Sequence, residues 1–282
     1  MVLNAPAQMQ FADHYFNASQ WEPAVSEYTR LIHFFPNAPQ VALARYRMGV
    51  ALFQQQQIER ALDQFQQVVA FTGAPTDLIF KALLQIGACT AQLQSPQAGA
   101  EYLRQVAGTT DDPEIKAEAL YRAGWLLLDA QDPHPAGDYF REIAASQRSR
   151  LDIDALLTEL SQADALPQKN PALSGGLALV PGVGYLYLGR YQDAWISLLA
   201  VGGLGWAAYE AFDNESPVLG SLLGVTGAGF YLGSIHGSVT SARRANQRET
   251  RRFIDGLRQK YKIQISFHPP QTEMGLILSG RF

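Results

Sequence analysis

The fold is decided by residues 48–69, which read MGVALFQQQQIERALDQFQQVV. Three further segments align with them, at residues 11–32, 86–107 and 123–144. Each segment has a small residue at its second position. These residues are Ala12, Gly49, Gly87 and Gly124, and successive ones are 37, 38 and 37 positions apart. A period of this length is typical of a chain built from stacked structural repeats.

A second small residue follows each of these about twelve positions later, and an aromatic residue follows four positions after that. The second small residues are Ala24, Ala61, Ala98 and Ala136, and the aromatic ones are Tyr28, Phe65, Tyr102 and Phe140. We interpret each segment as a helical hairpin, in which small residues allow close helix contact and the ring fills the space between helices. The third segment is one residue short between Gly87 and Ala98, which leaves its turn undefined.

This pattern resembles the tetratricopeptide repeat family over roughly residues 5–145. Its period is longer than the usual value of about 34 residues and is similar to that of bacterial cell-envelope assembly proteins. The resemblance implies an all-α superhelix that holds a partner protein or peptide. A generic helical bundle is the alternative. Residues 151–166 are predicted to form an amphipathic helix that caps the array.

The resemblance implies a partner-binding groove lined by the first helix of each hairpin. The residues predicted to line it are Asp13, Asn17, Tyr46, Phe53, Gln54, Gln92, Tyr121, Trp125 and Asp129. Aromatic rings among polar amides suit the capture of a peptide, because rings give contact area at a low cost in entropy. The alternative for the four aromatic residues is that they pack between repeats.

Residues 169–242 differ from the rest of the chain in charge and in glycine content. Only five side chains are charged between Pro171 and Ala242, and 14 of the 24 glycines lie there. The runs 194–212 and 216–242 are long enough for the roughly 20 apolar residues that a bilayer core requires. We predict a transmembrane helical hairpin turning at the sequence DNES. A buried helical pair in a soluble domain is the alternative.

Small residues recur at intervals of four in both predicted spans. They are Gly203 and Ala207 in the first span, and Gly220, Gly224, Gly229, Gly233 and Gly237 in the second. Helices in lipid associate through close contact at small residues. We therefore predict that these positions pack the two spans together.

Residues 171–189 are also uncharged, but Pro181 and Gly182 interrupt them. Such a segment is predicted to be interfacial or re-entrant rather than a straight span. The run PGVGYLYLGRYQDAWISLL, followed by the glycine-rich second helix, resembles a family of small bacterial two-helix membrane domains over about 70 residues. That resemblance implies an architecture and little chemistry.

The tail, residues 243–282, carries nine basic and three acidic groups. Its arginines next to the second span are predicted to contact anionic lipid headgroups, at about 1 kcal/mol each. They are Arg243, Arg244, Arg248, Arg251 and Arg252. Nucleic-acid binding is disfavoured, because aromatic residues that could stack on bases are sparse here. The alternation between Ile263 and Leu278 predicts a short C-terminal β-hairpin.

These differences divide the chain into an acidic repeat domain (1–168), a glycine-rich membrane domain (169–242) and a basic tail (243–282). Two spans would leave the repeats and the arginines on one side, which charge bias makes the cytoplasm. A third span at 171–189 would put the repeats in the periplasm. The resemblance to cell-envelope proteins favours the periplasm for the repeat domain, and the cytoplasm is the alternative.

The sequence contains no motif of an enzyme or of a cofactor site. It lacks a phosphate-binding G-x-x-x-x-G-K-[ST] loop, a G-x-S-x-G elbow and an H-E-x-x-H helix. Its five histidines have no ligand spacing, and Cys89 is its single cysteine. We predict a membrane-anchored interaction scaffold without catalytic activity, cofactor or metal. The alternative is a small transport or channel component with the repeats as a regulatory domain.

Overall fold

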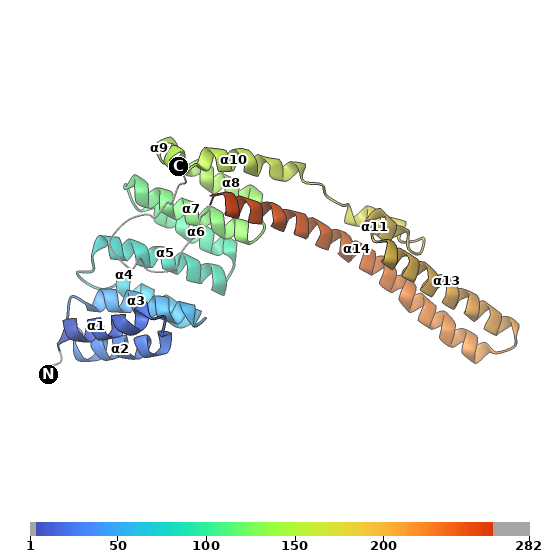
Figure 1. The fold of residues 1–282 in the computed structure, drawn as a ribbon, viewed down its shortest axis with the longest axis horizontal. Coiled ribbons are helices and arrows are strands. Elements are labelled where there is room, and N and C mark those ends of the chain that lie inside the picture. The colour runs from blue at the N-terminus through green and yellow to red at the C-terminus, as the bar shows by residue number, and fades with distance from the viewer. Residues whose placement is uncertain (1–3, 262–282) are drawn as a thin grey trace. The chain divides into compact units, whose positions relative to one another are not determined.

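The computed structural model describes residues 4–261, and its regular secondary structure there is helical throughout (Figure 1). The predicted all-α class is confirmed for this part, whereas the predicted β-hairpin lies outside the described residues. The chain divides into two compact units. Within the described residues, one unit contains residues 4–163 and 256–261, and the other runs from Asp164 to Asp255.

Four helical hairpins follow one another in the first unit. Their helices are α1 (Ala5–Asn17) and α2 (Trp21–Phe34), α3 (Val41–Gln54) and α4 (Ile58–Val69), α5 (Thr76–Leu93) and α6 (Pro96–Gly108), and α7 (Pro113–Asp129) and α8 (Pro133–Glu142). Each helix packs against the next along the chain. Two short helices, α9 (Ala145–Arg150) and α10 (Ile153–Leu160), complete the array together with the 3₁₀ turn Ser161–Ala165, and α10 packs on α8.

The hairpin turns explain the irregular third repeat. Three turns contain three residues and place one in the left-handed region, namely Ser19, Gln56 and Gln131. The third turn contains only Gln94 and Ser95, and the Ser95 hydroxyl caps α6 by accepting the Ala98 amide at 3.1 Å. Helix α5 ends six residues after Gly87, whereas the other first helices end five residues after their small residue. Because its turn is one residue shorter, the register of the second helix is preserved.

The residues that pack inside each hairpin follow from that register. A Cβ atom on Gly49 would lie 2.7 Å from the Phe65 ring, and one on Gly124 would lie 2.6 Å from the Phe140 ring. In the third hairpin, a Cβ on Gly87 would lie 2.5 Å from Leu103. The predicted packing residues of this repeat, Ala98 and Tyr102, are therefore wrong by one position: the buried pair is Gly99 and Leu103.

The lone cysteine lies in the interior of this array. Cys89 on α5 is fully buried, and burial raises the pKa of its thiol to about 12. Only the thiolate reacts rapidly with alkylating reagents. Modification of Cys89 at neutral pH therefore requires the array to open, which makes this thiol a reporter of repeat unfolding.

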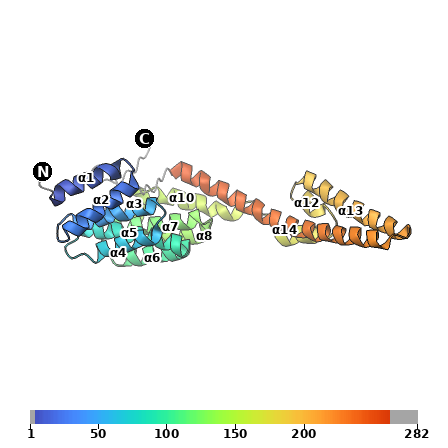
Figure 2. The ribbon, with the colours of Figure 1, turned by 90° about the horizontal axis from the view of Figure 1, so that it is seen from below.

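The second unit contains two short helices and two long ones. They are α11 (Pro171–Leu177), α12 (Val183–Tyr187), α13 (Tyr191–Asp213) and α14 (Pro217–Tyr261). Figures 1 and 2 show α13 running beside the first half of α14. At seven and five residues, α11 and α12 are far shorter than the roughly 20 residues of a span. Residues 171–189 thus fold as two short helices and not as a third straight span.

A buried serine pair attaches these short helices to α14. The hydroxyls of Ser174 on α11 and Ser238 on α14 lie 2.6 Å apart, and the Ser238 hydroxyl donates to the Ser174 carbonyl at 3.2 Å. Gly184 on α12 lies so close that a Cβ there would be 2.4 Å from the Ser238 hydroxyl. The polar groups at this junction therefore satisfy one another away from solvent.

Helix α14 is longer than the predicted second span. It continues for 45 residues, so the predicted boundary at 242/243 falls inside it. It is the one helix between residues 4 and 261 that is long and apolar enough to cross a membrane, with an 18-residue window of mean hydropathy 1.5. Its end belongs to the repeat unit: Arg258 pairs with Asp129 on α7, and Lys260 pairs with Glu159 on α10.

A methyl group added at a hairpin contact should destabilise the array. We expect Gly124→Ala to lower the free energy of unfolding by about 1–3 kcal/mol, because its Cβ overlaps the Phe140 ring. Gly108→Ala is the control, since its Cβ would meet nothing within 4 Å. Cys89 alkylation of the full chain in increasing urea measures the difference, and equal effects of the two variants would contradict this packing.

Candidate partner-binding surfaces

The predicted groove begins at Asp13 on α1, which takes part in a partly buried hydrogen-bond network. Its carboxylate accepts the Tyr28 hydroxyl proton at 2.6 Å and forms an ion pair with Arg47 of α3 at 2.5 Å. Burial and the Asp13 carboxylate raise the pKa of Tyr28 above its ordinary value. Asp13 therefore joins three helices through its Oδ1 atom.

The middle of the predicted groove lies around Tyr46 on α3. Tyr46 is partly buried and packs against the Phe65 ring with centroids 5.7 Å apart. Burial raises the pKa of its hydroxyl, whereas a hydrogen bond with Gln85 of α5 and the nearby charge of Arg122 on α7 lower it. Residues of three successive first helices therefore converge here, and neither Gln85 nor Arg122 was predicted.

The other aromatic residues of the predicted groove are mainly packing residues. Phe53 is 7% exposed and Trp125 only 2%. The Trp125 ring lies 6.3 Å from the rings of both Tyr121 and Phe140. Burial also raises the pKa of Tyr121. Phe53 and Trp125 are thus core residues, and the rings that Trp125 contacts belong to its own hairpin.

The polar residues of the predicted groove are more accessible. Asn17 and Gln92 are exposed, and Gln54 is partly so. Asp129, at the end of α7, is exposed as well, but its carboxylate accepts a hydrogen bond from Arg258. A partner that contacts these first helices would therefore meet side-chain amides on the first three repeats. On the last repeat it would meet the ion pair between Asp129 and Arg258.

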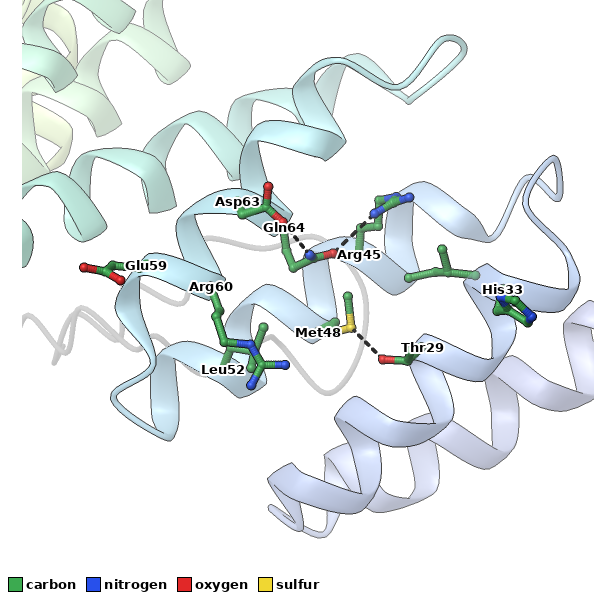
Figure 3. A pocket seen from close by; sticks show the side chains of 10 residues that line it. Thr29, His33, Arg45, Met48, Leu52, Glu59, Arg60, Asp63 and Gln64 are labelled. Carbon is green, nitrogen blue, oxygen red and sulfur yellow. Dashed lines mark hydrogen bonds between the residues drawn. The ribbon is translucent and has the colours of Figure 1, made fainter.

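A cleft of about 610 Å³ lies on the other side of the second hairpin (Figure 3). Its walls are the second helices α2 and α4, and its floor is α3. The floor and one wall are apolar, with Ile32, Met48 and Leu52, while the rim carries both signs of charge. The rim residues are His33, Arg45, Glu59, Arg60 and Asp63.

Hydrogen bonds hold the side chains of this cleft in place. Arg45 donates to Gln64 at 3.3 Å and to Gln67, and the Gln64 amide donates to Asp63 at 2.9 Å. Burial lowers the pKa of the Arg45 guanidinium, so this cation is partly desolvated. An apolar floor with a charged rim suits an apolar side chain of a peptide flanked by polar groups. The repeat pattern did not predict this cleft.

The glycines predicted to pack the two long helices behave in two ways. A Cβ on Gly220 would lie 2.8 Å from the Phe212 ring, and one on Gly237 would lie 2.2 Å from the Tyr185 hydroxyl. At Gly203, Gly224, Gly229 and Gly233, a Cβ would meet nothing within 4 Å. Ala207 is partly buried. The contact between α13 and α14 also includes Gly227, which was not predicted and whose Cβ would lie 3.3 Å from Leu204.

The arginines predicted to meet lipid lie along α14 beyond its apolar part. Arg243, Arg244, Arg248 and Arg251 are exposed and form no ion pair within residues 4–261, whereas Arg252 pairs with Glu249 at 3.0 Å. Two further cations lie near this stretch. Arg190 donates to Ser241, and Asn246 holds the backbone of Lys169 through two hydrogen bonds of 2.7 and 2.9 Å.

Comparison with known proteins supports the repeat assignment. Residues 43–70, which comprise most of α3 and all of α4, match the family model of the tetratricopeptide repeat. No curated protein matches the chain. Within the described part of the chain, no group of three or more His, Cys, Asp or Glu side chains is arranged to hold a metal ion. A tetratricopeptide repeat indicates a role in protein–protein interaction.

Removing the Asp13 carboxylate should destabilise the first two repeats. We expect Asp13→Ala to cost about 1–3 kcal/mol, because it leaves the Tyr28 hydroxyl and Arg47 without their partner. Asp138→Ala is the matched control. It removes an exposed pair with Arg141 and should cost about 0.5 kcal/mol or less. Thermal unfolding followed by circular dichroism compares them, and an equal loss in both would contradict the partly buried network.

Proposed function

We propose that this protein is a membrane-anchored interaction scaffold, whose repeats hold a partner protein next to the bilayer. The observation that carries the proposal is the distribution of exposed apolar side chains. Among the described residues, all large exposed ones except Phe11, Phe34 and Leu93 lie between Leu173 and Leu232. A helical repeat array is thus linked to a unit whose surface suits lipid rather than water.

The side chains of the two long helices support this anchoring. Leu199 and Trp206 on α13 are each 69% exposed, and Val225 on α14 is 74% exposed. Such residues in the middle of long helices would leave a soluble protein prone to aggregation, whereas a bilayer core accommodates them. The turn between the helices holds Asn214, Glu215 and Ser216, which suits a polar membrane surface.

The same geometry favours the cytoplasmic side for the repeats. In this proposal α13 is the second span beside α14, because α11 and α12 are too short to cross a bilayer. Two spans return the chain to the side from which it entered. The pairs Arg258–Asp129 and Lys260–Glu159 likewise require the end of α14 and the repeats to share one side. Arginine-rich segments next to a span remain in the cytoplasm. We therefore propose cytoplasmic repeats, in place of the periplasmic placement that the sequence favoured.

Single introduced cysteines test anchoring, span number and side together. Ser216→Cys lies in the turn between α13 and α14, Gln247→Cys lies in the basic part of α14, and Gln97→Cys lies on the repeats, all at exposed positions. Native Cys89 is buried and should stay unlabelled.

We expect a membrane-impermeant thiol reagent to label Ser216→Cys from one side of sealed vesicles, and Gln97→Cys and Gln247→Cys from the other. Labelling of Gln97→Cys and Gln247→Cys from opposite sides would show an odd number of spans. Equal labelling of all three in a supernatant free of membranes would contradict the anchor itself.

Site-specific crosslinking tests the scaffold role and separates the two candidate surfaces. A photoreactive residue at Gln92 probes the predicted groove, one at Gln64 probes the cleft, and one at Gln97 is an exposed control. We expect one specific protein to be captured in cells at Gln92 or Gln64 and not at Gln97. Capture of the same proteins at all three positions, or of none, would contradict a partner-binding array and would favour the transport alternative.

A further inference from the structure

A groove of about 490 Å³ lies between α13 and α14, within the unit Asp164–Asp255. Its apolar part is formed by Ile196, Val201 and Phe230, and Gly229 and Gly233 line it from α14. Because a Cβ on either glycine would meet nothing within 4 Å, these glycines leave open space rather than a helix contact. The volume falls in the range of about 300–1,000 Å³ that is usual for ligand sites.

The groove runs along the helix axes and is polar at one end. From Asp193 to Val201, which both line it, α13 rises by about 12 Å at 1.5 Å per residue. Asp193 pairs with Arg190 at 2.7 Å, and the Arg190 guanidinium lies 5.6 Å from the centre of the Tyr185 ring. At the opposite end the lining residues are Val201, Thr226 and Phe230.

One polar atom beside the groove lacks a partner. Ser197 lines the groove and is only 8% exposed, and its hydroxyl has no hydrogen-bond partner among the described residues. Buried hydroxyls without a partner are uncommon, because each costs free energy. The hydroxyl lies one helical turn from Asp193 and so near the polar end, where a ligand with an ester or hydroxyl group could satisfy it.

Cations from three segments lie just beyond this polar end. Arg190 donates to the Ser241 hydroxyl at 2.5 Å, and Lys169 is held by Asn246. Arg243 and Arg244 lie between these two positions of α14 and are exposed. We name Lys169, Arg190, Arg243 and Arg244 the cation layer. Asp193, which lines the groove, compensates only Arg190, so the cation layer carries a net positive charge beyond the polar end of the groove.

We propose that the groove binds an acyl chain of an anionic phospholipid, whose phosphate lies at the cation layer. This inference rests on the proposed membrane anchoring, because the polarity of the groove changes along the direction in which the two helices would cross the bilayer. A cation layer beyond the polar end of an apolar groove matches an anionic amphiphile. A helix of a second copy would leave the cation layer unpaired.

The test uses the full chain in phosphatidylcholine bilayers that contain a small fraction of phosphatidylglycerol with a photoreactive acyl chain. Phosphatidylcholine with the same acyl chain is the comparison lipid. After illumination, mass spectrometry locates the labelled residues. We expect phosphatidylglycerol to label residues 196–201 and 229–233 more than phosphatidylcholine does. The ratio of the two labelling yields should rise by about fivefold for each cation that contacts the phosphate.

Two leucine variants on one helix separate the groove from general contact with lipid. Gly233→Leu fills the groove and should reduce labelling there to the level of phosphatidylcholine, whereas Gly224→Leu, which does not line the groove, should leave it unchanged. Lys169→Gln should lower the preference for phosphatidylglycerol by about fivefold without moving the labelled residues.

Three outcomes would overturn the inference. They are equal labelling by both lipids in the unsubstituted chain, labelling that is spread evenly over α13 and α14, and crosslinks between two protein copies at the groove. Failure of the anchoring itself would look different, because the chain would then not enter the bilayers and neither lipid would label any residue.

Discussion

The rest of the molecule depends on one constraint, the apolar surface that α13 and the first half of α14 present to their surroundings. Residues such as Trp195, Leu199 and Leu222 are more than 60% exposed. Burial of apolar area is worth roughly 25 cal/mol per Å², so a surface of this kind in water would drive association. A bilayer removes that driving force without any further protein contact. The polar groups near α11 and α12 are satisfied internally, as the Ser174–Ser238 pair illustrates.

The repeat unit is stabilised by a different principle, close contact at small residues. Gly49, Gly99 and Gly124 bring two helices so near that an added methyl group would overlap a ring or a neighbouring backbone. Large residues such as Phe65 and Phe140 then become fully buried between helices. Because each hairpin completes its neighbour, the array needs a cap at its last repeat, and α10 packs there against α8. The end of α14 adds Leu257, which is 2% exposed, and an ion pair with Glu159.

Much of the repeat fold could be predicted from spacing, because the numbers of residues that separate Gly124, Ala136 and Phe140 in the sequence reflect helix geometry directly. In the third repeat the predicted packing residue was wrong, because Ala98, Gly99 and Ala100 are three small residues in succession. Only the length of the turn determines which of them packs against α5. The groove was predicted less well. Counting positions along a helix does not separate an open wall from a contact with the next helix, and Trp125 lies in such a contact.

The surfaces that the sequence did not predict are formed by residues far apart in the chain. The cleft at Met48 is formed by residues of α2, α3 and α4 together. In the cation layer, Lys169 is bonded to Asn246, which lies 77 positions later in the chain. The change in charge after Ala242 suggested a boundary, yet α14 continues through it. The change in composition at this point therefore does not mark the end of a helix.

Partition of the full chain between water and a detergent that separates on warming tests the central claim most directly. If α13 and α14 face lipid, as proposed, the intact protein collects in the detergent-rich phase and forms large aggregates when detergent is removed. A monodisperse full-length protein that remains in the aqueous phase, with its repeats folded, would contradict it. The exposed side chains of α13 and α14 would then have to be covered by protein.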